Sequence, residues 1–431
     1  MQEYDIIIIG AGAAGLMAAR ELARAGKKTI LLEARDRIGG RVHTVLSGEG
    51  EYLEYGPEFI HGDLPITKSL LNEAGLSFHL AAGSWWQFRK GELIQSQEII
   101  PHWDTFAQQL QKLEKDIPLQ DFLDQYFHTP EYADLREAAI RFATGYDTAD
   151  PADASTFALR QEWLAEEDSP QYRIDQGYSS LMQFLLDDYL QQGGQISLST
   201  PIKELHWEMQ AVKAIAADNR QFVSDQVIIT IPLNVLKAAD GETGSIHFYP
   251  AIPEYMSAVQ KPAMGAIIKF LLQFDHPFWT DHPVHGKRLN DLQFILSEET
   301  VPTWWTQYPK QSAVLTGWLG GPPAKKWTKG KDEQLLQLAL SSLAAIFQSD
   351  EDSLKRMLRS FTIINWTADA YTLGSYSYAT VETAAVMDTL QNGVAETLFF
   401  AGEAFYNGPL IGTVEAALTS GKEIALKLLS R

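Results

Sequence analysis

Near the N-terminus, two short and uninterrupted runs of apolar residues flank a stretch in which apolar residues recur at helical spacing. The first run covers residues 6–9 and the second covers residues 29–32. An apolar run of this length that is bounded by turn residues predicts a strand buried on both faces. The order strand, helix, strand predicts an α/β unit that extends to about residue 80.

Beyond this unit the pattern changes twice. Between residues 104 and 165, apolar side chains recur at helical spacing and prolines punctuate the stretch, which predicts a helical insertion. Short apolar runs then return, and many of them look like an antiparallel set. The predicted strands of this later part are residues 195–198, 226–231, 266–274, 292–296 and 313–318, and the predicted helix is residues 333–347. The chain ends in a short buried strand up to Glu403, a loop, and a helix that begins near Thr413.

The turn after the first strand has glycines at Gly10, Gly12 and Gly15, in the spacing G-x-G-x-x-G. A dinucleotide pyrophosphate needs bare backbone N–H groups at a helix N-terminus, and glycines let it come close to them. Glu33, at the end of the second strand, stands where a carboxylate can accept both hydroxyls of an adenosine ribose. The spacing alone is a weak signal, but its strand-turn-helix-strand-acid context predicts a site for FAD or NAD.

Two more glycines, Gly39 and Gly40, precede Arg41 shortly after this acid. The glycines let the backbone approach an anion, and the guanidinium fork suits phosphate oxygens. A surface turn with solvated charges would have the same composition. The neighbouring dinucleotide fingerprint favours the phosphate interpretation.

Composition narrows the class of protein further. The chain has 55 acidic and 35 basic residues, a formal charge of -20, and this argues against nucleic acid as a partner. The chain contains no cysteine, which excludes disulfides, thiolate metal sites and a cysteinyl flavin tether. We see no metal-ligand cluster and expect no metal. The first strand starts close to Met1 and no apolar window is long enough to span a membrane, so we expect a cytoplasmic protein without membrane contacts.

The segment Leu31–Arg41, together with the glycine turn before it, resembles the flavin-containing amine oxidase superfamily. The resemblance continues along the chain, in residues 55–62, 176–181, 200–202, 399–403 and 412–417. It implies FAD that is bound without a covalent tether. It also implies a Rossmann-like FAD-binding domain made of residues 1–80, 170–237 and 390–431. The substrate domain is then α+β, with a helical part at residues 81–169 and a mixed or antiparallel sheet with helices at residues 238–389.

The resemblance also implies which residues contact the cofactor. Ile202 would hold the adenine through its backbone, and Glu403 would contact the ribityl or pyrophosphate region. The helix that begins at Thr413 would point its N-terminus at flavin O2, where it stabilises negative charge on the reduced ring. The full set of expected cofactor residues is Gly10, Gly12, Ala14, Gly15, Glu33, Ala34, Arg35, Gly39, Gly40, Arg41, Gly56, Pro57, Glu58, Ile202, Gly402, Glu403, Gly412, Thr413 and Val414.

Lys269 lies within the apolar run 266–274, where a charge is unfavourable unless it is paired or hydrated. One interpretation is the outward face of an edge strand. The other follows from the resemblance, in which the lysine of this strand holds a water beside flavin N5. On that interpretation Lys269 is a catalytic residue.

His61 and Tyr376 are the other two catalytic candidates that the resemblance implies. His61 stands in a segment similar to one in polyamine oxidases, where the histidine lies near the reacting amine and could accept its proton. Tyr376 would form one wall of an aromatic cavity for a neutral amine, and Ser375 before it is consistent with an untethered flavin. A second wall cannot be assigned, although Phe405 and Tyr406 lie in the C-terminal loop. Glu58 and Asp63 could also anchor a distal ammonium.

The function implied by the resemblance is oxidation of a primary or secondary amine, with polyamines among the candidates. Hydride passes from the α-carbon to flavin N5, the imine hydrolyses, and dioxygen is reduced to hydrogen peroxide. The expected partners are therefore a small-molecule amine and O2. The alternatives are an L-amino acid oxidase, a flavin desaturase or protoporphyrinogen-type oxidase, and a flavoprotein binding module with little turnover.

Overall fold

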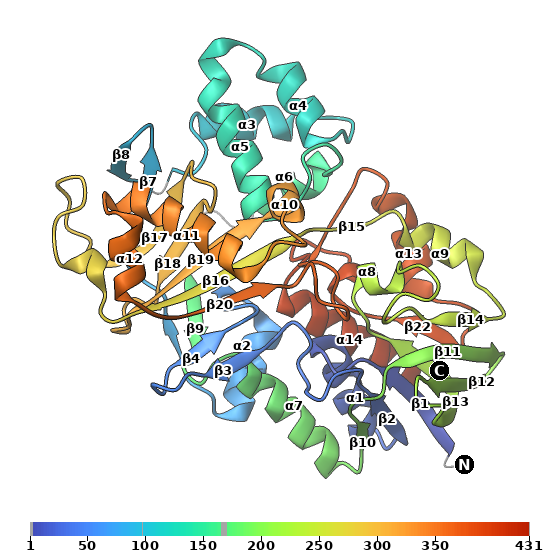
Figure 1. Cartoon of the computed structure of the whole chain (residues 1–431). Helices are drawn as coiled ribbons and strands as arrows, with labels where there is room; N and C mark the ends of the chain where they lie inside the picture. Colours follow the sequence, from blue (N-terminus) through green and yellow to red (C-terminus); the bar gives the residue numbers. More distant parts are fainter. Residues whose placement is uncertain (1–2, 97, 165–169, 431) are drawn as a thin grey trace.

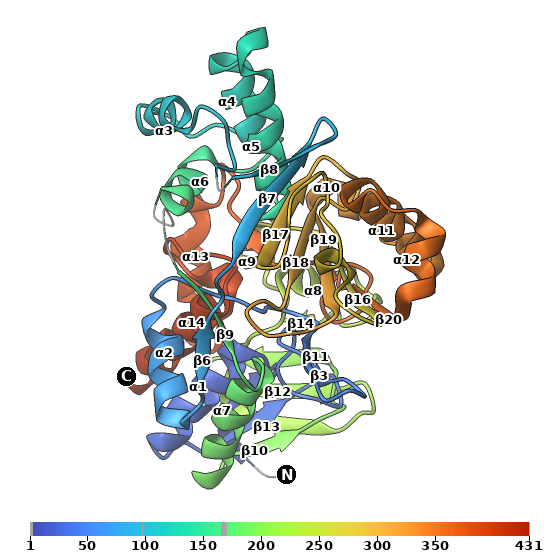
Figure 2. The same cartoon turned by 90° about the vertical axis from the view of Figure 1, so that its left-hand side faces the viewer.

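Two large sheets form the molecule, and the computed structural model describes residues 3–96, 98–164 and 170–430. The eight-stranded sheet lies at the lower right of Figure 1 near both chain termini, and the seven-stranded sheet lies at the left. A group of helices projects above the seven-stranded sheet, as Figure 2 also shows. No helix in the described ranges has the length and apolarity that a membrane crossing requires.

The eight-stranded sheet brings together parts of the chain that are far apart in sequence. β1 (Glu3–Ile9) pairs in parallel with β2 (Thr29–Leu32) and with β13 (Gln221–Ile229), so the first two apolar runs form neighbouring buried strands, as predicted. The other strands are β10 (Gln195–Ser197), β11 (Ile202–Glu208), β12 (Ala211–Ala216), β14 (His247–Tyr249) and β22 (Leu398–Phe400). β22 also pairs in parallel with β13, so both ends of the chain meet on this strand.

Helices cover both faces of this sheet. Successive side chains of its strands point alternately into two hydrophobic cores, one on each face. On β1, Ile6 and Ile8 face one core, whereas Ile7 and Ile9 face the other. The first core is shared with α1 (Ala13–Arg24), α2 (Pro65–Ala74), α7 (Ser179–Gln191) and α14 (Val414–Leu429). The second is shared with α8 (Leu233–Leu236), α9 (Pro253–Val259) and α13 (Met387–Asn392). Burial on both faces explains the uninterrupted apolar runs in the sequence.

The seven-stranded sheet is mainly antiparallel. Its order is β20 (Leu358–Asn365), β16 (Ile267–Phe274), β19 (Val314–Gly320), β18 (Thr303–Thr306), β17 (Leu292–Ser297), β7 (Ser84–Arg89) and β8 (Glu92–Gln95). Only the β7–β17 pair among these strands is parallel, so the predicted mixed sheet is confirmed. One face packs on α10 (Gly321–Lys325), α11 (Asp332–Phe347) and α12 (Glu351–Met357).

The projecting helices have a hydrophobic core of their own. They are α3 (Trp103–Gln111), α4 (Leu119–Tyr126), α5 (Ala133–Gly145) and α6 (Thr156–Trp163), with a 3-10 turn at Pro130–Tyr132. Ser155 begins α6 by accepting a hydrogen bond from the Ala158 N–H at 3.1 Å. The helical insertion is thus present where the spacing of apolar residues predicts it.

Small sheets connect the two large ones. β5 (Ile60–His61) and β6 (Phe78–Leu80) both pair with β9 (Gln171–Ile174). The two remaining pairs are β3 (Thr44–Leu46) with β4 (Tyr52–Glu54) and β15 (Ala263–Met264) with β21 (Ser377–Tyr378). Further 3-10 turns span Phe278–Thr280, Ala384–Val386 and Glu403–Phe405.

The domain bounds stay a prediction, and three strands pair outside the part of the chain in which they were expected. β14 lies within residues 238–389 but pairs with β11 in the eight-stranded sheet. β7 and β8 lie within residues 81–169, expected to be helical, yet they join the seven-stranded sheet. Both assignments depend on pairing between distant segments, which local spacing does not report.

Candidate active site

A cavity of about 1080 Å³ lies between the two large sheets. It is lined by the carboxyl ends of β1 and β2, by the loops before α1 and α14, and by β16, β17 and β18. Every expected cofactor residue except Gly15 lines it, and so do Lys269, His61 and Tyr376. Sequence segments from both ends and the middle of the chain therefore meet at one site.

The first glycine turn leaves backbone N–H groups directed at this cavity. Gly12 is the N-cap of α1 and has no side chain that could cover the first turn of the helix. A Cβ at Gly15 would lie 1.9 Å from the carbonyl oxygen of Gly10, so this glycine permits close packing of helix on strand and need not line the cavity. Gly10 has a φ of +103°, which a glycine adopts without strain. This geometry fits a pyrophosphate at the start of α1.

Glu33 lies at the end of β2 and is buried at the cavity wall. Its carboxylate accepts hydrogen bonds from the Ala11 N–H at 2.7 Å and the Arg35 N–H at 2.8 Å. Burial raises the pKa of Glu33, and the two backbone N–H groups partly oppose that rise. Each oxygen keeps a lone pair for a further donor, so the carboxylate fits the two hydroxyls of a ribose.

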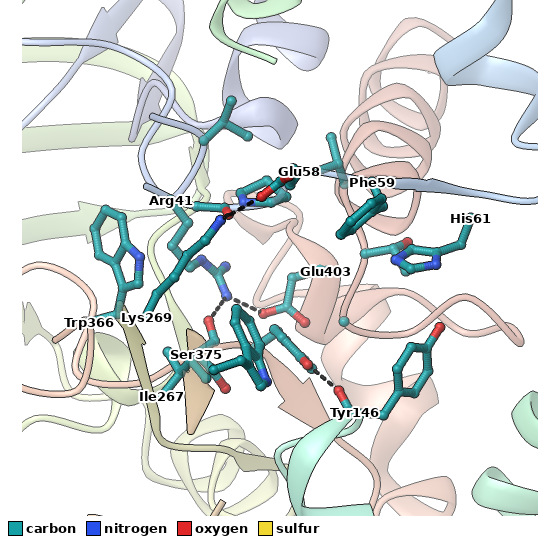
Figure 3. A pocket seen from close by; sticks show the side chains of 18 of the residues that line it. Arg41, Glu58, Phe59, His61, Tyr146, Ile267, Lys269, Trp366, Ser375 and Glu403 are labelled. Carbon is teal, nitrogen blue, oxygen red and sulfur yellow. Dashed lines mark hydrogen bonds and ion pairs between the residues drawn. The ribbon is translucent and has the colours of Figure 1, made fainter. Parts of the chain in front are cut away.

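Arg41 and Glu403 lie side by side at the cavity, as Figure 3 shows. Arg41 donates to Glu403 at 2.8 Å and to the Ser375 carbonyl at 2.7 Å. Arg35 instead donates hydrogen bonds to Asp369 and Thr372.

The helix α14 begins at the cavity. Thr413 caps it by accepting a hydrogen bond from the Ala416 N–H at 3.1 Å, so the N-terminus of the helix lies at the cavity wall. This donor set fits a bound FAD.

Lys269 is buried in the interior of the seven-stranded sheet. β16 pairs with both β19 and β20, so the alternative interpretation of Lys269 as an exposed residue on an edge strand is wrong. Its Nζ donates to the Gly56 carbonyl at 3.1 Å and to Glu58 at 3.2 Å (Figure 3). It also lies over the ring of Trp305, 5.4 Å from the centroid.

Glu58 accepts hydrogen bonds from side chains on three strands. It accepts hydrogen bonds from Arg173 on β9 at 3.0 Å, from Trp305 on β18 at 3.0 Å and from Gln307 at 3.0 Å, in addition to the bond from Lys269. Burial by itself raises the pKa of Glu58, but the two cations and the two neutral donors outweigh burial and hold the pKa below its usual value. The buried carboxyl is therefore an anion.

Glu58 and Asp63 were considered as carboxylates that bind a distal ammonium of the substrate, and their contacts can be compared with that role. Glu58 is already surrounded by four donors of the protein itself. Asp63 is exposed and pairs with Lys68 at 3.0 Å, and it does not belong to the cavity lining. The anchor role of these two carboxylates stays a prediction, and the geometry gives it no support.

His61 and Tyr376 approach the cavity from different elements and meet at Tyr146. The ring of His61 lies edge-on to that of Tyr146, with centroids 5.8 Å apart, and 5.9 Å from Phe59. The hydroxyl of Tyr376 donates to the carbonyl of Tyr146. Ser375 shares a hydrogen bond of 2.6 Å with Thr148. Tyr146 thus stands beside both predicted residues.

Several cavity residues were missed in the sequence. Among them are Tyr146, Gln171 and the aromatic wall formed by Trp85, Phe294, Trp305 and Trp318. Phe405, considered for the second wall, lies in the core against Phe400 instead. The pair Trp304-Trp305 could have indicated this wall in the sequence. Successive residues of a strand point to opposite faces, so one of the two tryptophans must face away from the core.

Comparison with known proteins supports the same assignment. A family profile described as flavin containing amine oxidoreductase matches residues 13–429. Polyamine oxidase 3 of Oryza sativa subsp. japonica is 25% identical over 99% of this chain and 90% of its own length. Lysine-specific histone demethylase 1B of Mus musculus is 25% identical over 98% of this chain, which spans about half (52%) of that relative.

Solved structures share the fold at lower identity. A putrescine oxidase bound to putrescine has a TM-score of 0.81 and 19% identity, with all of both chains covered. Cyclohexylamine oxidase from Brevibacterium oxydans IH-35A has a TM-score of 0.79 and 19% identity, again with all of both chains covered. The predicted fold class is confirmed, and the family match confirms the predicted flavin cofactor. The chain belongs to the flavin-containing amine oxidoreductase family.

Proposed function

We propose that this protein oxidises a small primary or secondary amine and passes the electrons to dioxygen, with hydrogen peroxide as a product. One observation carries the proposal: a single cavity joins a cradle that fits FAD to Lys269 and to an aromatic wall. Bound FAD supplies the hydride acceptor for the α-carbon of the amine and the site that O2 reoxidises. Polyamine oxidase 3 and putrescine oxidase, among the similar proteins, support an amine as substrate.

The aromatic wall binds and orients the amine. Trp85, Phe294, Trp305 and Trp318 form a chain of neighbouring rings at the cavity wall, and such rings keep water away from a bound amine. Their faces attract a cationic amine on entry, and the dry slot then favours the neutral form that reacts. The formal charge of -20 also favours the approach of cations.

Lys269 supplies a fixed proton donor in the cavity wall. Two of its donor sites are directed at Gly56 and Glu58, which hold the ammonium in place. A lysine ammonium has three donors, so one remains for a water or a reacting group in the cavity. We propose that this third proton orients the water that hydrolyses the imine or assists the reaction with O2.

His61 is proposed to receive the proton of the incoming amine at its imidazole. Its ring stands at the cavity wall between Phe59 and Tyr146. If polyamines are the substrates, His61→Ala should impair their oxidation and leave monoamines unaffected. Equal activity of this variant on every amine would refute the polyamine assignment.

A second candidate substrate is an amine that also carries a carboxylate. Arg89 and Arg141 line the cavity, and both lie near Glu298, at 3.2 Å and 3.8 Å. Arg89 also pairs with Asp134 at 3.7 Å, and the two guanidinium groups place cations in the cavity lining, which favours contact with an anionic group of a substrate. An L-amino acid oxidase would use such a contact.

The experiment is anaerobic mixing of the FAD-loaded protein with a panel of compounds, followed by an assay for peroxide in air. The panel contains putrescine, spermine, benzylamine, cyclohexylamine, L-amino acids and a methylated lysine peptide. Flavin bleaching by amines without a carboxylate supports the proposal. Bleaching by amino acids alone selects the second candidate. A flavin that no compound bleaches would contradict both.

A further inference from the structure

The segment between β20 and β21 runs along the cavity, and we call its residues 366–374 the strap. Trp366, Tyr371 and Thr372 of the strap belong to the cavity lining, and Figure 3 shows Trp366 at this wall. The Trp366 indole donates to the Tyr55 carbonyl at 2.9 Å, which fixes the beginning of the strap. The strap thus leads from the seven-stranded sheet to the cofactor cradle.

The strap is bonded on both sides of the strand that leads into the glycine turn. β1 lies between β2 and β13 in the eight-stranded sheet, and the three strands run in parallel. Arg35, just after β2, donates to Asp369 of the strap at 3.0 and 2.5 Å. Asn234, just after β13, donates to the Leu373 carbonyl at 2.7 Å. The strap therefore crosses the carboxyl ends of these strands, where the glycine turn and Glu33 also lie.

The contact between Arg35 and Asp369, which we call the latch, is a two-pronged ion pair. Both Nη atoms of Arg35 bond to the carboxylate, and Nη2 also donates to the Thr372 hydroxyl at 3.0 Å. The Arg35 side chain is 14% exposed and that of Asp369 is 28% exposed, so solvent ions reach the pair in part. Burial by itself raises the pKa of Asp369, but the hydrogen bonds and the charge of Arg35 outweigh burial and hold the pKa below its ordinary value.

We propose that the strap closes the cofactor cradle and that the latch sets the rate of FAD release. Because the strap lines the cavity and is bonded on both sides of β1, release of FAD from this end requires the strap to move. The chain has no cysteine that could tether a flavin, so retention depends on contacts of this kind. Asp369 does not belong to the cavity lining, so it is a positioning residue that acts through Arg35. The inference concerns the cofactor and is independent of which amine is oxidised.

The test measures the release of FAD without any substrate. FAD-loaded protein is diluted into dextran-coated charcoal, which captures free FAD, and the flavin left on the protein is followed by its absorbance. Asp369→Asn keeps an oxygen for the Tyr371 N–H, which Asp369 binds at 3.0 Å, but loses the charge that faces Arg35. Release should be about tenfold faster than in the wild type, the scale of one hydrogen bond to a charged group. The spectrum of the bound flavin should stay the same.

Two further variants and salt make the outcome specific. Asp369→Glu keeps the charge and should release FAD within about threefold of the wild-type rate. Asp36→Asn is the matched control, because Asp36 is an exposed acid next to Arg35 in the chain, and its release rate should stay within about twofold of the wild type. In about 1 M sodium chloride the latch is screened, so the rates of Asp369→Asn and the wild type should converge.

An unchanged release rate in Asp369→Asn would overturn the inference, because the strap would then not control the exit of FAD. Equally fast release from Asp369→Asn and Asp369→Glu would also overturn it, since the turn at Tyr371 and not the ion pair would be responsible. A tenfold difference that persists at high salt would exclude an ionic latch.

If Asp369→Asn does not fold, Arg35→Lys tests the same latch. Lysine keeps the charge but cannot make the two-pronged contact, so release should be about threefold faster, and an unchanged rate would overturn the inference. Wild-type protein that holds FAD but is bleached by no amine would refute the proposed function and leave this inference standing.

Discussion

The cofactor side of the cavity is built mainly from backbone groups of two loops, whereas the facing side is built from side chains that several strands bring together. On the first side, the turn at Gly12 and the loop before Thr413 each expose a helix N-terminus, and Glu33 adds one carboxylate. On the second side, Glu58 bridges Lys269 and Arg173. The first side therefore depends on local conformation, and the second depends on the tertiary fold.

The largest expected effect tests the first side. Gly15→Ala places a Cβ 1.9 Å from the Gly10 carbonyl oxygen, so the start of α1 must move away from the strand. We expect the purified variant to lose its flavin, with FAD affinity at least about 100-fold weaker, because the phosphate site is a backbone geometry. Absorbance of the purified protein and titration with FAD measure this.

Gly48→Ala is the matched control, because its added Cβ meets no atom within 4 Å. It should retain flavin as the wild type does. A yellow Gly15→Ala protein with unchanged FAD affinity would show that the cradle does not depend on this close contact, and the contrast between the two sides would fail.

The second prediction concerns chemistry on the facing side. Lys269→Met removes the ammonium but keeps a side chain of similar length in the sheet. Turnover should fall on the order of 100-fold, the scale of one positioned proton donor, while FAD stays bound. Peroxide release and the visible spectrum are measured on the same sample. Unchanged kinetics would remove Lys269 from the site.

The third prediction tests whether Glu58 and Lys269 act as a unit in stability. Glu58→Gln leaves Lys269 and Arg173 buried with no shared anion, which should lower the free energy of unfolding by about 3–5 kcal/mol. In the double variant with Lys269→Met, the total loss should be smaller than the sum of the single losses by about 1–3 kcal/mol. Urea unfolding measures all three.

Glu382→Gln serves as the control for this cycle. Glu382 is exposed and pairs with Lys261, whose side chain is partly exposed. Its replacement should change the free energy of unfolding by less than about 1 kcal/mol. Losses that add in full in the Glu58 and Lys269 double variant would mean that the buried pair is not coupled.

The residues of the cofactor side can be predicted from the sequence far more readily than those of the facing side. Gly12, Glu33 and Arg41 stand in one continuous stretch whose spacing is imposed by the ligand, so their roles can be predicted from order alone. Arg173 and Gln171 occupy the short run Gln-Tyr-Arg-Ile, which indicates a strand but not what lies opposite. Lys269 was found because a charge in an apolar run demands a partner, although Glu58 as that partner required the fold.

The fourth prediction concerns pH and a buried carboxyl at the end of β4. Glu54 is buried and accepts hydrogen bonds from the Tyr178 N–H and the Thr44 hydroxyl, yet burial prevails and raises its pKa to about 7. The pKa of Glu54 in the folded protein exceeds its value of 4.5 in the unfolded chain. The stability that protonated Glu54 gives to the folded protein is therefore complete below pH 4.5 and is lost as the pH rises through 7. This group should lower the free energy of unfolding by about 3 kcal/mol across that window.

Glu54→Gln should flatten that part of the stability profile, because an amide stays neutral. Unfolding in urea at pH 5, 6, 7 and 8 measures the slope for both proteins. Parallel profiles for the variant and the wild type would show that Glu54 ionises normally in the folded protein.

The smallest expected effect separates positioning from cofactor binding. Tyr376→Phe keeps the aromatic ring at this position but removes the hydroxyl that donates to the Tyr146 carbonyl. Since one hydrogen bond to a neutral acceptor is worth about 1 kcal/mol, kcat/KM for the best amine should fall about fivefold through the looser placement of Tyr146 beside His61. FAD affinity should stay unchanged, because the hydroxyl of Tyr376 is directed at the Tyr146 carbonyl. A variant that loses FAD instead would show that the two sides of the cavity are not separable.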